Sequence, residues 1–289
     1  MNRIPLHPLS VCLVLSLTLL SPAISTAQES GSEPVHWAYS AFLGTGWYKL
    51  DSKEQVYVLR IPPRWYFRKS SIDESGHRKF GIEFHFPLTF GLHKLEEVGD
   101  FIDIDNIGTA SFNPGVEIEY PVSSRWHLRA YAHLGWGREY GSSESAWIYD
   151  AGLKSRYSFQ NGKLDWGIVN EVFLSGYDAK NTGDDKFTGM LAGLDFSYPI
   201  GWGSGSGSAL KLDWDIAYRW FENNPLFPRT TAEPISIEDN WEIGVAIARQ
   251  DGPIKVWFMK FEHMGLVYRF NSDGGFRAIT VNFRSPFTR

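Results

Sequence analysis

The clearest pattern along this chain is an alternation of apolar and polar residues with a period of two. In the segment that begins at Arg277, the apolar face consists of Ile279, Val281, Phe283 and Phe287. The opposite face consists of Ala278, Thr280, Asn282 and Arg284. Because successive side chains of a β-strand point to opposite sides, this pattern predicts a strand with one apolar and one polar face.

Similar segments recur along the chain, separated by turn-forming residues, and we expect about twelve strands. They are Trp37–Tyr48, Gln55–Phe67, Phe80–Leu92, Thr109–Tyr120, Trp126–Gly137, Ala146–Phe159, Lys163–Tyr177, Phe187–Tyr198, Ala209–Phe221, Asp239–Arg249, Ile254–Phe270 and Phe276–Phe287. Many are long for a soluble sheet, but they match the roughly nine to eleven residues of a tilted strand that crosses a bilayer. The predicted fold is therefore all-β, an antiparallel transmembrane β-barrel.

Alternation alone does not say which face points inward. In a soluble β-sandwich or lipocalin-like barrel, the apolar face would form the core. The long aromatic and aliphatic faces, and the Trp residues at both ends of Trp126–Gly137, instead favour apolar faces that contact lipid. We expect the membrane barrel, with the soluble architectures as the alternative.

The connections between segments form two classes, as in bacterial barrels with tight periplasmic turns and longer external loops. The short connections are near Pro121–Arg125, Gln160–Gly162 and Gln250–Pro253. The long connections are near His93–Gly108, Asp178–Lys186 and Glu222–Ile237. The connection from Arg68 to Lys79 is long where a short one is expected.

Two segments contain irregularities. Pro62-Pro63 falls inside the second segment, where proline has no N–H to donate, so we expect a bulge or a break. In the eleventh segment the apolar residues change from odd to even positions near His263–Gly265. A β-bulge would explain this change, and so would a turn that splits the segment.

The N-terminus is predicted to direct export. The short apolar run Val11–Leu20 and the small residues Ser25-Thr26-Ala27 indicate a secretory signal peptide over 1–27, followed by a short segment, 28–35, and the barrel, 36–289. The single cysteine, Cys12, lies within the apolar run, so the exported chain would have no thiol. Disulfides, thiolate metal sites and cysteine nucleophiles are then excluded.

Composition supports the same interpretation. The formal charge of −5 is small and indicates no nucleic-acid partner. Aromatic residues make up 16% of the chain, including 12 Trp, a residue that suits the boundary between lipid and water.

The closing residues resemble the last hairpin of autotransporter-type translocator barrels. The resemblance lies in Phe261–Phe270, the turn Asn271–Gly275 and the terminal strand. More narrowly, the chain resembles in pattern and end motif the solitary autotransporter barrels of proteobacteria, which have the barrel and no passenger. Only Gln28–Val35 separates the inferred cleavage site from the first strand, which is a departure from the family.

This resemblance implies a twelve-stranded barrel in the outer membrane of a Gram-negative bacterium, with a structural or pore-forming role. Its expected partners are outer-membrane lipid and lipopolysaccharide, and the barrel assembly machinery during insertion. A narrow, porin-like channel for small solutes is the alternative function, and a lipid-modifying barrel enzyme is a further one.

If the apolar faces contact lipid, charged residues of both signs face the lumen. The candidate lumen-lining residues are Arg60, Arg64, Arg68, Glu83, His85, Glu117, Glu119, His127, Arg129, His133, Lys211, Asp213, Asp215 and Arg219. We expect either a network of ion pairs that fills the lumen or charged rings in a selective channel. Arg60, Arg64 and Arg68 form the best candidate for an anion-preferring row, or they are counter-ions of Glu117 and Glu119.

Candidate catalytic chemistry is sparse. His85, His133 and His263 are possible bases, but none occurs in a recognisable arrangement with a nucleophile. Asp184-Asp185 lies in an expected loop, and Asp103-Ile104-Asp105 could be part of a calcium loop but suits a solvated one. The sequence therefore assigns no catalytic residue, no metal site and no cofactor.

Overall fold

The computed structural model describes residues 43–50, 54–92, 107–140, 144–181, 183–200, 209–223, 226–227, 235–252, 254–256 and 259–283. The predicted signal peptide 1–27, the segment 28–35 and the acidic stretch Asp103–Asp105 lie outside these residues. The strands are β1 (Thr45–Leu50), β2 (Glu54–Ile61), β3 (Arg64–Arg68), β4 (Ser71–Ile72), β5 (Arg78–Lys79), β6 (Gly81–His85), β7 (Leu88–Leu92), β8 (Ile107–Phe112), β9 (Gly115–Pro121), β10 (Trp126–Glu139), β11 (Ser145–Asn161), β12 (Leu164–Ala179), β13 (Gly183–Pro199), β14 (Leu210–Phe221), β15 (Leu226–Phe227), β16 (Ile235–Ser236), β17 (Asp239–Arg249), β18 (Ile254–Val256), β19 (Met259–Phe261), β20 (His263–Phe270) and β21 (Phe276–Asn282). Within the described residues, no helix is long and apolar enough to cross a membrane.

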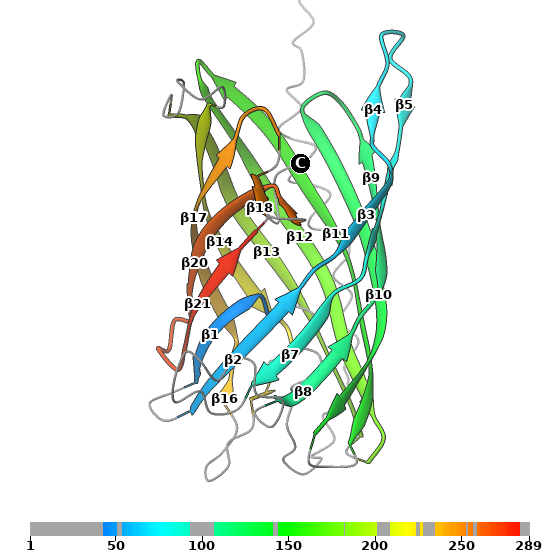
Figure 1. The fold of residues 1–289 in the computed structure, drawn as a ribbon, viewed down its shortest axis with the longest axis vertical. Helices are drawn as coiled ribbons and strands as arrows, with labels where there is room; N and C mark the ends of the chain where they lie inside the picture. Colours follow the sequence, from blue (N-terminus) through cyan, green and yellow to red (C-terminus); the bar gives the residue numbers. More distant parts are fainter. Residues whose placement is uncertain are drawn as a thin grey trace, which may run out of the picture. The chain divides into compact units, whose positions relative to one another are not determined.

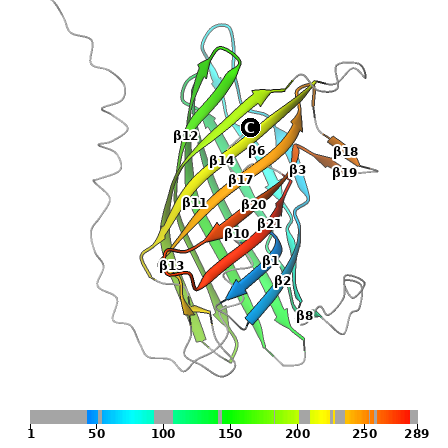
Figure 2. The ribbon, with the colours of Figure 1, turned by 90° about the vertical axis from the view of Figure 1, so that its left-hand side faces the viewer.

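The strands of the described chain close into a barrel of twelve antiparallel strands, which confirms the predicted fold class (Figure 1). The ring runs β1, β2, β7, β8, β10, β11, β12, β13, β14, β17, β20 and β21. It closes because β21 pairs with β1, with Ala278 opposite Tyr48. Figure 2 shows β14, β17, β20 and β21 side by side in this closing half.

Prolines divide three barrel strands into two pieces each. Pro62-Pro63 separates β2 from β3, Phe86-Pro87 separates β6 from β7, and Asn113-Pro114 separates β8 from β9. Because the proline carbonyls still accept, Phe86 N–H donates to Pro63 O (2.9 Å) and Asn113 N–H donates to Pro87 O (3.2 Å). The break expected at Pro62-Pro63 is confirmed, and hydrogen bonds between neighbouring strands continue past it.

The change of parity in the eleventh segment coincides with a split of the segment into separate strands. β18 and β19 form their own two-stranded sheet, and β20 then begins at His263. The expected strand Ile254–Phe270 is therefore split. The split does not change the number of barrel strands in the described residues, because β18 and β19 lie outside the main sheet.

The long loop expected near Asp178–Lys186 was a wrong prediction. β12 continues to Ala179 and β13 begins at Gly183, and these two residues lie opposite each other. Gly183 has φ +91°, which only glycine adopts without strain. Asp184 and Asp185 are accordingly strand residues of β13 and do not lie in a loop.

The connection between Arg68 and Lys79 is a hairpin extension. β4 pairs with β5, with Ser71 opposite Lys79. The Asp73 carboxylate accepts hydrogen bonds from the backbone N–H groups of Ser75 (3.1 Å) and His77 (2.8 Å). We call the barrel end with this hairpin and the turns at 122–125 and 162–163 the turn end, and the opposite end the loop end.

On most of the long barrel strands the exposure of side chains alternates, and the apolar side chains are the exposed ones, which is the reverse of a soluble barrel. On β17, Ile243, Val245 and Ile247 are 47%, 51% and 42% exposed. The alternating residues Glu242, Gly244 and Ala246 are buried. The outer surface is therefore apolar, and the inner face carries the charged residues.

The interior at the loop end is apolar. Its buried cluster consists of Tyr48, Val58, Ala146, Ile148, Phe173, Tyr177, Ala179, Phe187, Phe221, Ile237, Phe276 and Ala278. At its centre the rings of Phe173, Phe187 and Phe221 pack edge to face, with centroids 5.7–6.4 Å apart. These contacts fill the interior at this end with packed side chains.

Candidate functional site

The charged residues predicted to face the lumen fall into three exposure classes. The buried ones are Glu83, His85, Glu117, His127, Arg129, Asp213, Asp215 and Arg219. Those of intermediate exposure are Arg60, Glu119, His133 and Lys211. Arg64 and Arg68 are exposed.

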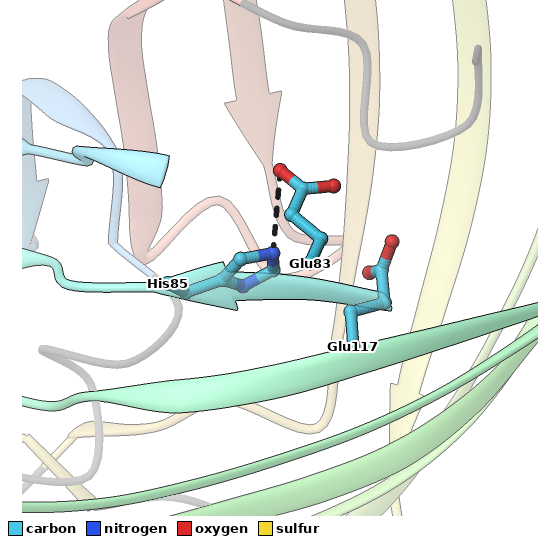
Figure 3. A group of neighbouring side chains, drawn as sticks. All are labelled: Glu83, His85 and Glu117. Atoms are coloured by element: carbon cyan, nitrogen blue, oxygen red, sulfur yellow. Dashed lines mark ion pairs between the residues drawn. The ribbon is translucent and has the colours of Figure 1, made fainter. Parts of the chain in front are cut away.

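A first group of ion pairs surrounds two acidic residues that lie directly opposite each other, Glu83 on β6 and Glu117 on β9 (Figure 3). Like charges in this position repel, so nearby cations are needed. Arg64 Nη1 lies 3.5 Å from Glu83, and Lys154 Nζ and Arg129 Nη1 each lie 3.7 Å from Glu117.

The ion-pair group continues on β9 and β10. Arg129 Nη2 lies 3.1 Å from Glu119, and His127 Nδ1 lies 2.9 Å from the same carboxylate. The Ser70 hydroxyl also donates to Glu119, at 2.7 Å. Because Arg129 contacts both Glu117 and Glu119, it links the acids of β9 into one network.

A chain of hydrogen bonds connects two of the predicted histidines to a carboxylate. His85 Nδ1 lies 3.1 Å from His133 Nε2, and His133 Nδ1 lies 2.7 Å from Asp150 Oδ2. Asn113 donates to the other Asp150 oxygen at 2.8 Å. Gly115 makes room for the His133 ring, since a Cβ there would overlap it. These hydrogen bonds fix the orientation of both imidazoles.

A second group lies on β11 to β14. Arg156 makes a two-pronged contact with Asp195, from Nε to Oδ2 at 2.7 Å and from Nη2 to Oδ1 at 2.8 Å. Nearby, Asp213 accepts from the Ser197 hydroxyl at 2.6 Å and lies 3.7 Å from Lys211 Nζ.

A third group lies on the closing strands. The Glu242 carboxylate is 2.9 Å from Arg269 Nε and 4.0 Å from Arg219 Nη1. Asp215, on β14, packs where Gly244 of β17 leaves space for its carboxylate. Together the three groups spread paired charges around the inner face.

The three arginines expected to form one row meet different partners. Arg60 Nη1 donates to the backbone carbonyl of Leu43 at 3.4 Å, and Arg64 pairs with Glu83. Arg68 donates from Nε to Phe80 O at 2.8 Å, and its guanidinium lies 4.2 Å above the Phe80 ring. A register shift between Tyr66 and Arg68 separates the last arginine from the others.

Several interior residues were missing from the predicted set, notably Asp150, Asp195 and Arg269. Asp150 has the same parity on β11 as Lys154 and Arg156, so the alternation alone could have identified it. The same argument applies to the other two. Their partners, by contrast, depend on the register between strands.

Tyr131 allows a direct test of the interior hydrogen bonds. Its hydroxyl donates to Glu171 at 2.7 Å, in contact with Gly152, and both Tyr131 and Glu171 are buried. Tyr131→Phe should lower the free energy of unfolding by about 1.5–3 kcal/mol, because a buried carboxylate loses a donor. Urea unfolding in detergent or lipid measures this loss. Tyr120→Phe, on an exposed ring, is the control. An equal loss of stability in the two variants would contradict a stabilising hydrogen bond from Tyr131 to Glu171.

No family model and no curated protein matches this chain in comparisons with known proteins.

Proposed function

We propose that this protein is an integral β-barrel of the Gram-negative outer membrane, of autotransporter translocator type, with a filled interior and a structural role. The observation that carries the proposal is the inverted distribution of side chains. Exposed apolar residues face outward on successive strands, and buried charged residues face inward. In water such a surface would associate, whereas in lipid it is the stable arrangement.

The spacing of aromatic residues supports a membrane span. On β10, Trp126 lies near the turn end and Trp136 near the loop end, ten residues apart. Ten residues of strand rise about 34 Å, which at a tilt near 40° is roughly 26 Å along the barrel axis. This matches an apolar band of about 25 Å with an aromatic girdle at each edge.

The girdle residues also pack side by side. Near the turn end, a row of rings crosses four strands, with centroids 4.2 Å apart for Phe159–Trp166, 6.5 Å for Trp166–Phe196 and 5.2 Å for Phe196–Trp214. Near the loop end, Trp136 lies opposite Trp147 on the outer face. Rings at both edges suit the two interfaces of a bilayer.

The interior supports a closed barrel in preference to an open channel. Inward-facing polar residues such as Ser175, Asp195 and Glu242 are only 0–2% exposed, so water does not reach them. At the loop end, the apolar cluster around Phe187 packs across the interior. A structural barrel fits this packing better than a solute channel.

Heat-modifiable gel migration and planar-bilayer conductance test the proposal together. We expect the folded protein to migrate faster than the boiled form and to give no steady conductance steps. Steady, ion-selective steps would favour the channel alternative. A protein that stays soluble without detergent and shows no shift would contradict the membrane location.

A further inference from the structure

Glu83, His85 and Glu117 bring three metal-ligating side chains together inside the barrel (Figure 3). One ligand atom from each residue lies within 4.8 Å of the other two, and all three residues are buried. Glu83 and His85 are two residues apart on β6 and share its inner face, while Glu117 lies opposite Glu83 on β9. Paired strands thus hold the three groups on a rigid support.

A second observation concerns His85 alone. Its side chain is 10% exposed, and its Nε2 has no hydrogen-bond partner among the described residues. That nitrogen lies 3.6 Å from Glu83 Oε1, which is within ion-pair distance, as the dashed line in Figure 3 marks, but beyond hydrogen-bond distance. Buried polar atoms are normally hydrogen-bonded, so a buried imidazole nitrogen that has no hydrogen bond and lies next to the Glu83 carboxylate requires an explanation.

The hydrogen-bond chain behind His85 explains which atom carries the proton. The Asp150 carboxylate only accepts, so His133 donates to it from Nδ1. A neutral His133 then accepts at Nε2, and His85 must donate from Nδ1. In a neutral His85, Nε2 then carries a lone pair on the side of the Glu83 carboxylate. Metal-bound histidines have this arrangement, with the second N–H held by an outer group.

We propose that Glu83, His85 and Glu117 bind one divalent transition-metal ion of the zinc class. Two carboxylate oxygens and one imidazole nitrogen suit zinc and its first-row neighbours better than calcium or magnesium, which prefer oxygen ligands alone. His133 and Asp150 are positioning residues, because they act through His85.

Three cations lie near the two carboxylates. Arg64 lies 3.5 Å from Glu83, and Arg129 and Lys154 lie 3.7 Å from Glu117. These distances exceed the 2.7–2.9 Å of a charge-assisted hydrogen bond. Zinc bonds of about 2.0–2.2 Å would draw the ligand atoms to roughly 3.3 Å apart, so the glutamate side chains turn inward on binding.

Titration of the folded full chain in detergent micelles with Zn²⁺ alone, against a chromophoric chelator, tests the site. We expect one equivalent of zinc to bind the wild-type protein, and His85→Gln and Glu117→Gln each to abolish binding. His127→Gln is the matched control, because His127 contacts Glu119 outside the triad, and it should bind zinc normally. Heat-modifiable migration verifies that each variant is folded.

Two further readouts distinguish ligands from structural residues. X-ray absorption of the bound zinc should show one imidazole among oxygen ligands. Asp150→Asn should weaken binding about 10- to 100-fold, as expected for an outer-shell partner. Absence of binding to the wild-type protein, or equal binding by folded Glu117→Gln, would overturn the site. The gel shift tests the membrane barrel and the titration tests the triad, so the two proposals fail separately.

Discussion

Replacing Ile216 with arginine is expected to lower the free energy of unfolding in lipid by about 2–4 kcal/mol, because the new charge would face hydrocarbon near the middle of β14. Ile216 is 38% exposed on the outer face, and its cross-strand neighbour Ile243 is 47% exposed. Reversible unfolding in phospholipid vesicles, followed by tryptophan fluorescence, measures the effect.

The same substitution distinguishes a membrane barrel from a soluble barrel. In a soluble barrel, an exposed isoleucine changed to arginine should alter stability by no more than about 0.5 kcal/mol. Lys211→Ala, on the inner face of the same strand, is the control. Lys211 is half-buried and lies 3.7 Å from Asp213, so its loss should cost about 1 kcal/mol or less. A larger effect for Lys211→Ala than for Ile216→Arg would reverse the assignment of the faces.

The fold was largely predictable from the sequence because alternation is a local property. The period of two identifies the strand, and its parity identifies the face, as Ile279 and Ala278 illustrate on β21. The rule that proline interrupts a ladder was applied at Pro62-Pro63, and it holds equally at Pro87 and Pro114. The breaks at Pro87 and Pro114 could therefore also be predicted from the sequence, by the same rule.

The error at Asp178–Lys186 has a different cause. Its Asp, Asn and Gly residues favour turns locally, but backbone pairing of β12 with β13 extends the strands almost to the end of the hairpin. Pairing depends on the neighbouring strand and outweighs local propensity here. The composition of this segment therefore could not predict the length of the loop.

The geometry of the site was the least predictable feature. The parity of a residue in its strand tells that the side chain faces inward, but it does not tell which side chain on a neighbouring strand it contacts. The sequence offers Arg64 as a counter-ion of Glu117 or Glu119, whereas the structure places it 3.5 Å from Glu83. The His85–His133–Asp150 chain likewise joins residues 17 and 48 positions apart. Such contacts follow from strand register, which the sequence pattern does not contain.

Removing one partner of the Arg156–Asp195 pair is expected to have the largest effect of any single interior change. Asp195 is 2% exposed, and both of its oxygens accept from the same guanidinium. Asp195→Asn should cost about 3–5 kcal/mol, because it removes the buried counter-charge of a largely buried arginine and leaves only the exposed Asp165, 3.8 Å away. The measurement is again reversible unfolding in vesicles.

The double variant Arg156→Met with Asp195→Leu tests whether the lost stability comes from the unpaired charge or from the packing around the pair. Replacing both charges with apolar side chains of similar size is often neutral or stabilising, so most of the lost stability should return. Arg68→Ala, at an exposed arginine, provides the control and should cost less than about 1 kcal/mol. If the double variant is as unstable as Asp195→Asn alone, the cost lies in the packing of this region and not in the unpaired charge.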